Sequence, residues 1–137
     1  MLSKRINYKN YYYYLQLWDT AIDPNNNEIY KEFYAGAKGV FLIYDITNTD
    51  SFNNIKNYNK QVDEKISTPY KVLIGYNSDK ENRVITAEEG KKLAEELKID
   101  SFFEIPSIGE EKITEMLNIL SVKNLFDEKK NNNCLII

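Results

Sequence analysis

The chain has 137 residues, of which 42% are hydrophobic and 28% charged, and its formal net charge is −3. A chain of this size and composition is expected to fold as one globular domain with a single core. It has no histidine and one cysteine, which excludes Ser-His-Asp and Cys-His nucleophilic sites, histidine-bearing zinc sites, iron–sulfur clusters and disulfide frameworks. The acidic balance offers no basic surface to a phosphate backbone, so nucleic acid is not an expected partner.

Short apolar runs of strand length recur along the chain. Near the N-terminus, residues 4–8 and 11–18 flank a Lys-Asn turn and predict an antiparallel hairpin at one edge of a sheet. The runs at 14–18, 40–44, 72–74 and 102–105 are mostly apolar on both faces. This pattern is typical of parallel strands that are buried on both sides.

Helical patterns separate these runs. The first is an apolar stripe on a helix that ends before Pro69, and it consists of Phe52, Ile55, Tyr58, Val62 and Ile66. Thr86 and Glu89 form a predicted capping box at the start of a second helix. A third helix is expected to carry Ile113, Met116, Leu117 and Leu120. Alternating strands and helices predict an α/β protein with an open parallel sheet.

Ligands bind to such sheets at the carboxyl ends of the strands. The segments expected there are residues 19–21, 45–47, 75–79 and 106–108. Because the chain has no histidine, a carboxylate or an amide must carry any chemistry at this edge.

Three segments have a recognisable pattern: Leu-Gln-Leu-Trp-Asp-Thr-Ala at 15–21, Phe-Tyr-Ala-Gly-Ala at 33–37, and Leu-Ile-Tyr-Asp-Ile-Thr-Asn at 42–48. These segments and their spacing closely resemble the Rab-type small GTPases of the Ras superfamily. The resemblance implies a fold like that of P-loop NTPases over residues 1–126: an open, mostly parallel sheet covered by helices, here without the family's first strand, P-loop and first helix. Residues 127–137 are expected to form a disordered tail.

The resemblance implies GTP or GDP with Mg²⁺ as ligands, held by five sequence elements. The P-loop, Gly-x4-Gly-Lys-Ser/Thr, is absent because no two glycines stand five residues apart, and the switch I threonine is absent as well. Asp19 matches the family's Mg²⁺-steadying aspartate. Ile22 and Asp23 replace the glycine that senses the γ-phosphate and the glutamine that orients water. Catalytic residues are therefore not expected in this chain.

The guanine-binding elements are also altered. Asp79 matches the family's guanine-reading aspartate, Asn77 stands in place of the lysine that packs on the base, and Tyr76 replaces the bracing asparagine. Residues 106–108 replace Ser-Ala-Lys. A charged acceptor such as Asp79 contributes roughly 1.5 to 3 kcal/mol, whereas a micromolar complex needs about 8 kcal/mol. We expect no tightly bound cofactor, and Asp19, Asn77 and Asp79 to be vestigial.

A simpler interpretation applies to the retained carboxylates. Asp19 and Asp45 each follow a strand and precede a turn, where an aspartate commonly caps a turn or a helix. Asp79 lies in an Asn-Ser-Asp-Lys sequence that is typical of an ordinary turn. On this interpretation the three residues have structural roles only.

The last four residues, Cys134-Leu135-Ile136-Ile137, fit a C-a-a-X prenylation box, and an aliphatic final residue favours a geranylgeranyl group over a farnesyl group. A single lipid with few nearby lysines gives reversible membrane attachment. We therefore expect the protein on the cytoplasmic face of the plasma membrane or an endomembrane, in exchange with the cytosol. The resemblance implies a prenyltransferase and Rab chaperones or effectors as partners.

These observations favour a Rab-like protein of vesicle transport that is prenylated and does not bind or hydrolyse GTP effectively. The alternative is a functional Rab GTPase whose N-terminal P-loop segment is missing from the gene model. Four changes argue against it, since they lie outside that segment: those at Ile22, Asp23, Tyr76 and Pro106. A third interpretation is a product without function, because loss of the family's central first strand leaves its neighbours to pair directly or not at all.

Overall fold

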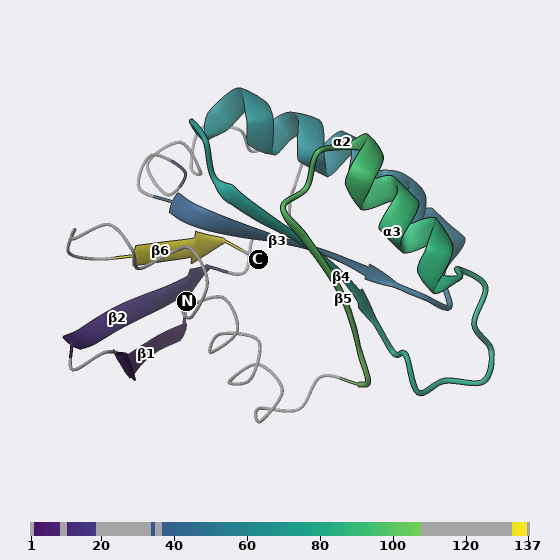
Figure 1. Ribbon diagram of the computed structural model, residues 1–137, viewed down its shortest axis with the longest axis horizontal. Coiled ribbons are helices and arrows are strands. Elements are labelled where there is room, and N and C mark those ends of the chain that lie inside the picture. The colour runs from purple at the N-terminus through teal and green to yellow at the C-terminus, as the bar shows by residue number, and fades with distance from the viewer. Residues whose placement is uncertain (1, 9–10, 19–33, 35–36, 108–132, 137) are drawn as a thin grey trace.

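The computed structural model describes residues 2–8, 11–18, 34, 37–107 and 133–136 (Figure 1). Their strands form one six-stranded sheet with the order β1-β2-β6-β3-β4-β5. The elements are β1 Leu2–Tyr8, β2 Tyr11–Trp18, β3 Ala37–Asp45, α2 Thr49–Lys65, β4 Tyr70–Tyr76, α3 Ala87–Glu96, β5 Ser101–Ile105 and β6 Asn133–Ile136. The predicted α/β class is confirmed.

The strand pairings follow the predicted pattern at both ends of the sheet. Strands β1 and β2 form the expected antiparallel hairpin, in register from Leu2 opposite Leu17 to Tyr8 opposite Tyr11. Strand β4 pairs in parallel with β3 on one side and with β5 on the other. Side chains alternate between the two faces of a strand, and both Phe41 and Leu42 of β3 are buried. The runs in β3 and β4 are thus buried on both faces, as predicted, whereas in β5 residues 102–104 are half-buried. The burial of the run at 14–18 is not described.

Helices α2 and α3 lie side by side on one face of the sheet (Figure 1). In the predicted stripe of α2, Ile55, Val62 and Ile66 are buried, and the two aromatic residues are partly buried. The capping box of α3 is also present: Glu89 N donates to Thr86 Oγ1 and Thr86 N donates to Glu89 Oε2. The third predicted helix, with its residues 113–120, lies outside the described residues.

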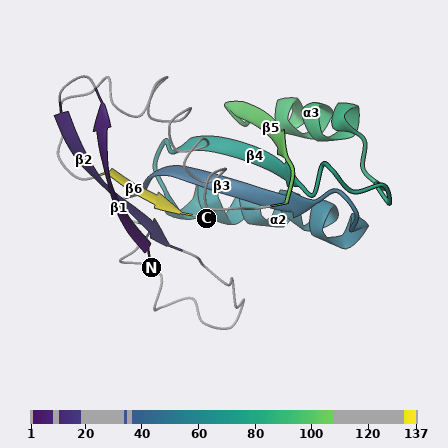
Figure 2. The same ribbon diagram turned by 90° about the horizontal axis from the view of Figure 1, so that it is seen from below.

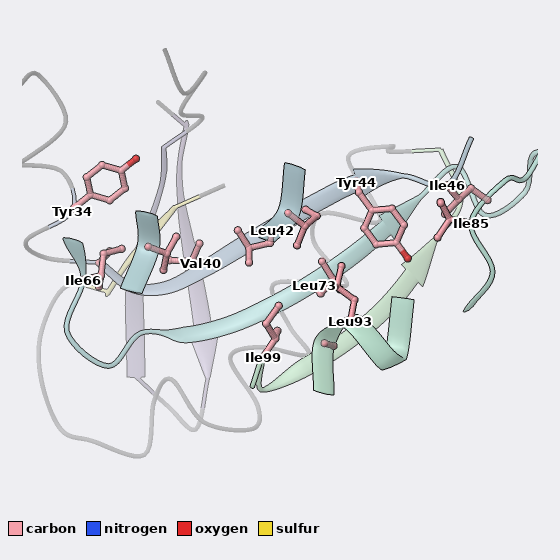
Figure 3. Close-up of a cluster of buried hydrophobic side chains, with 14 residues drawn as sticks. Tyr34, Val40, Leu42, Tyr44, Ile46, Ile66, Leu73, Ile85, Leu93 and Ile99 are labelled. Carbon is pink, nitrogen blue, oxygen red and sulfur yellow. The ribbon is translucent and has the colours of Figure 1, made fainter. Parts of the chain in front are cut away.

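The core between this face and the helices is built around Tyr44 (Figure 3). Its side chain is 1% exposed, and its ring packs edge-on against Phe52 with the ring centres 4.9 Å apart. Gly75 of β4 and Gly90 of α3 approach this ring so closely that neither has room for a side chain. A Cβ atom built on Gly75 would lie 2.9 Å from Tyr44 Oη. The tyrosine thereby dictates glycine at two positions distant in sequence.

The end of the chain differs from the expectation. Residues 133–136, expected in a disordered tail, form β6, which runs parallel to and between β2 and β3 (Figure 2). The expected choice for β2 and β3, direct pairing or none, is therefore wrong as well. Leu135 and Ile136 favour strand conformation, and insertion satisfies backbone groups on both flanking strands. Residues 127–132 lie outside the described residues.

Candidate functional site at the carboxyl ends of the strands

The carboxyl ends of β3, β4 and β5 bring three loops together, as expected for parallel strands. Ile46 N donates to the carbonyl of Tyr76 at 3.2 Å, which joins the loop after β3 to the loop after β4. Ser78 N donates to the carbonyl of Ile105 at 3.0 Å, which joins the second loop to the end of β5. Three of the four segments predicted to lie at this edge therefore meet there. The fourth, residues 19–21, lies outside the described residues.

Asp45 is the centre of the hydrogen bonding at this edge. Its Oδ1 accepts from Thr47 N at 2.8 Å and from Thr47 Oγ1 at 2.7 Å, and the nearby side chains of Asn77 and Tyr76 also favour its charged form. Burial raises the pKa of Asp45, but these hydrogen bonds to the charged form outweigh it, so that the pKa lies below its ordinary value. Asp45 thus holds a turn together, as its simpler interpretation predicts.

Tyr76 and Asn77 direct their side chains to the neighbouring loop. Burial, followed by the charge of Asp45 and the hydrogen bond to it, raises the pKa of the Tyr76 hydroxyl. Asn77 has a φ of 67°, a left-handed conformation that asparagine tolerates better than most residues. At the two positions where the resemblance implies an asparagine and a lysine that support the base, both side chains therefore lie near the Asp45 carboxylate.

Asp79 lies in the loop after β4, and its side chain reaches the loop after β5. Its Oδ1 accepts from Ser107 N at 3.1 Å, a contact between residues 28 apart in sequence. The carboxylate that the resemblance assigns to guanine is thus bound to an amide of the chain itself. Asp79 and Ser107 are both exposed, so this hydrogen bond lies at the surface of the molecule.

The other predicted site residues are described only in part. Asp19, the predicted vestigial Mg²⁺ position, lies outside the described residues, as do Ile22 and Asp23. No cluster of three or more potential metal ligands occurs among the residues that are described. Cys134 lies in β6, where its backbone is paired with Gln16 and Ala37. In the described part of the chain, no helix is long and apolar enough to span a membrane.

Two polar contacts were not foreseen from the sequence. Buried Lys71 donates from Nζ to Asn59 Oδ1 at 2.9 Å and to Asp63 Oδ1 at 2.8 Å, linking β4 to α2. Arg83 and Glu104 form a bidentate ion pair at 2.7 and 2.8 Å. For the first contact, the sequence did contain a signal: Lys71 lies in an otherwise apolar strand, which indicates a buried partner for its charge. The Lys71 contacts lie apart from the loops around Asp45 and Asp79. Arg83, in contrast, belongs to the same loop after β4 as Asp79, and Val84 N next to it donates to the carbonyl of Ile46 at 2.9 Å.

These contacts do not fit a guanine nucleotide held as the resemblance implies. One oxygen of Asp79 already accepts a hydrogen bond from the chain, and the side chains at the two neighbouring positions, Tyr76 and Asn77, lie near the Asp45 carboxylate. The sequence contains no P-loop that could cradle phosphates. The described residues therefore assign no reaction step to a nucleotide.

An open α/β sheet with parallel strands and helices is consistent with a truncated small-GTPase domain. The model of the Ras family matches residues 1–125, so the chain belongs to the Ras family. Within that family several relatives carry Rab names, among them RABD2a and RABE1d of Arabidopsis thaliana, which confirms the predicted Rab type.

Three relatives illustrate the extent of the similarity. The chain is 38% identical over 123 residues to the Ras-related protein SEC4 of Saccharomyces cerevisiae, covering 89% of this chain and 56% of that protein. It is 36% identical over 115 residues to the Ras-related protein RABE1d of Arabidopsis thaliana, covering 82% and 49%. It is 38% identical over 87 residues to the GTP-binding protein YPTM2 of Zea mays, covering 62% and 43%. The chain thus spans about half the length of the curated relatives it matches.

Proposed function

We propose that this chain is a Rab-like protein of vesicle-mediated transport that associates with membranes and binds partners, without binding GTP tightly or hydrolysing it. The observation that carries the proposal is the hydrogen bond between Ser107 N and Asp79 Oδ1, 3.1 Å long. A guanine base that used this carboxylate in the family's manner would compete with the loop of the chain itself. Because Ser107 N and Asp79 Oδ1 already bond to each other, replacing this bond by one from a base to the same oxygen gains little free energy.

The loss of the other elements points the same way. Preorganised amides, a lysine and Mg²⁺ ligands supply most of the stabilisation in phosphoryl transfer. This sequence has no Gly-x4-Gly-Lys-Ser/Thr motif to provide them, and Asp23 stands in place of the water-orienting glutamine. A binding role on the Rab surface requires none of these groups.

Membrane association would come from lipidation of Cys134. In this step the Cys134 sulfur forms a bond to C1 of an isoprenyl diphosphate, the C–O bond breaks, diphosphate leaves with the electron pair, and the thiol proton passes to solvent. One lipid chain adds about 0.8 kcal/mol for each buried CH₂ group, which supports reversible attachment to a cytoplasmic membrane face. A prenyltransferase and Rab chaperones or effectors are the partners that this role requires.

A second candidate is a guanine-nucleotide-binding GTPase of which this chain is a part. Its support is the length comparison, since the aligned region covers 56% of the SEC4 relative. Restoring a P-loop would still leave Tyr76 and Asn77, which lie near Asp45, at the positions where the family has an asparagine and a lysine that support the base. We therefore favour the binding role.

Lipidation is tested by incubating the full chain with each C-a-a-X prenyltransferase and a radiolabelled geranylgeranyl or farnesyl diphosphate. We expect one geranylgeranyl group per chain, less farnesyl, and co-flotation of the product with phosphatidylcholine–phosphatidylserine vesicles. The matched control is Cys134→Ser, which should take up no label. If neither the chain nor a peptide of residues 127–137 is labelled, the proposed lipidation is wrong.

A further inference from the structure

Strand β6 contains three of the four residues of the prenylation box, and each of them has a strand neighbour on both sides. Toward β2, Cys134, Leu135 and Ile136 lie opposite Gln16, Leu17 and Trp18. Toward β3, the same three residues lie opposite Ala37, Gly39 and Val40, with an irregularity of register between Ala37 and Gly39. These three residues of the box therefore lie in an interior strand of the sheet.

Among the described strands, β6 alone joins the two halves of the sheet. Strand β2 pairs with β1 and β6, and β3 pairs with β4 and β6. Figure 2 shows β6, in yellow, between the hairpin and the parallel strands. If β6 withdrew, one edge of β2 and one edge of β3 would each lose its row of backbone partners, which costs free energy wherever water does not replace them.

We propose that closure of the sheet by β6 and lipid attachment at Cys134 are alternative states of the same residues. This inference rests on the proposed lipidation. An enzyme that modifies a C-terminal tetrapeptide binds it as an extended chain in its own groove. The backbone of Cys134, Leu135 and Ile136 cannot occupy such a groove while it is paired with β2 and β3.

The same competition governs the modified protein. A lipid on Cys134 that inserts into a bilayer draws the adjacent residues to the membrane surface, and residues 133–136 are too short a segment to serve both places. The modification-competent fraction then depends on the free energy of β6 insertion, because only the withdrawn state can react. In the lipidated protein, the backbone groups of β2 and β3 that pair with β6 in the unmodified protein are accordingly left without this partner strand.

Hydrogen exchange measured by mass spectrometry tests the proposal without an enzyme. The full chain is alkylated on Cys134 with geranylgeranyl bromide in denaturant, refolded in the presence of detergent, and compared with the unmodified chain. We expect exchange at residues 15–18 and 37–40 to become about tenfold faster or more, while β4 and α3 keep their protection. The matched control carries Cys134→Ser and Ser67→Cys and receives the same lipid at the exposed bend after α2. Its exchange at 37–40 should stay at the unmodified rate.

Three results would overturn the proposal. Unchanged protection of 37–40 after lipidation at Cys134 would mean that β6 stays in the sheet. Equal loss of protection in both lipidated chains would assign the effect to the lipid rather than to its position. Loss of protection in β4 and α3 as well would mean that the lipidated chain unfolds instead of adopting a second folded state. The chemical alkylation keeps these results separate from an enzyme's failure to label residues 127–137, which refutes only the proposed lipidation.

Discussion

Tyr44 is the largest of the fully buried side chains in the described residues, yet its hydroxyl has no hydrogen-bond partner among them. Burial raises its pKa to about 12, the nearby charges of Glu104 and Glu89 add to this effect, and that of Arg83 opposes it. A buried, unsatisfied hydroxyl costs about 1 to 3 kcal/mol. The ring itself packs against Phe52 and beneath two glycines, so the cost belongs to the oxygen alone.

Replacing Tyr44→Phe should therefore keep the fold and raise its stability. We expect the free energy of unfolding at pH 7 to increase by about 1 kcal/mol, as measured by urea denaturation, because the unsatisfied group is removed and the ring is kept. Tyr44→Ala, as a control, should lose about 3 to 5 kcal/mol through the cavity it leaves. A loss of more than about 1 kcal/mol in the phenylalanine variant would show that the hydroxyl has a partner.

The pH dependence of the same residue has a defined sign. The pKa of Tyr44 is raised from 10.0 to about 12 in the folded chain, so the unfolded chain loses this proton first as pH rises. The contribution of the Tyr44 proton to the free energy of unfolding is therefore fully present below pH 10 and is lost between pH 10 and about 12. We expect the urea midpoint of the wild type to fall relative to that of the Tyr44→Phe variant as the pH is raised across that range. A difference that does not change with pH would contradict the assignment.

At the residue scale, the sequence identified the positions at the site better than their contacts. The position of Asp45, at the end of a strand and before a turn, was enough to predict that its carboxylate holds the turn. Nothing local in the sequence indicated that Asp79 would accept from Ser107, because the two are 28 residues apart and meet only when β4 and β5 are paired. Long-range contacts of this kind depend on register, which periodicity does not specify.

At the scale of elements, the link between α2 and β4 depends on a buried polar cluster. Lys71, on β4, bonds to Asn59 and Asp63, and Asn59 Nδ2 donates to Asp63 Oδ2 at 3.1 Å. The lysine side chain is 9% exposed, while that of Asp63 is 50% exposed. The charge of the lysine is thus compensated by one solvated carboxylate and one buried amide.

Removing the charge while keeping the shape should destabilise this link. We expect Lys71→Met to lower the free energy of unfolding by about 1 to 3 kcal/mol, because Asn59 keeps a buried acceptor without a donor. The double variant Lys71→Met with Asn59→Leu should recover part of that loss, since both partners are then apolar. Urea denaturation of the two variants measures the difference. Equal stability of the single variant and wild type would mean that the cluster contributes nothing.

Elements with a local signal were predictable. The helix that ends before Pro69 and the capping box at Thr86 correspond to α2 and α3, because apolar spacing and cap chemistry act within a few residues. Asn59 was missed for the opposite reason. It occupies a buried position on α2 where an apolar residue is the default, and only its distant partner Lys71 explains it.

For the whole molecule, the family resemblance predicted the architecture but not how its centre is filled. The polar residues before Cys134 and the lipidation motif itself both predict a disordered tail at the C-terminus. In the structure it is a strand between β2 and β3. Its four residues carry too little pattern to reveal a partner more than 90 residues away in sequence. The same residues therefore support a lipidation motif and a structural strand.

The central claim, that this Rab-like chain does not bind guanine nucleotide tightly, is tested most directly by calorimetric titration of the purified full chain with GDP and Mg²⁺. Co-purified nucleotide is first extracted and quantified by chromatography, cooperative melting confirms that the chain is folded, and Asp79→Ala serves as the matched variant. We expect no stoichiometric nucleotide and no saturable binding up to about 100 μM GDP in either chain, because a single carboxylate contact falls far short of a micromolar complex. Submicromolar binding by the wild-type chain, or a stoichiometric guanine nucleotide carried through purification, would contradict the account.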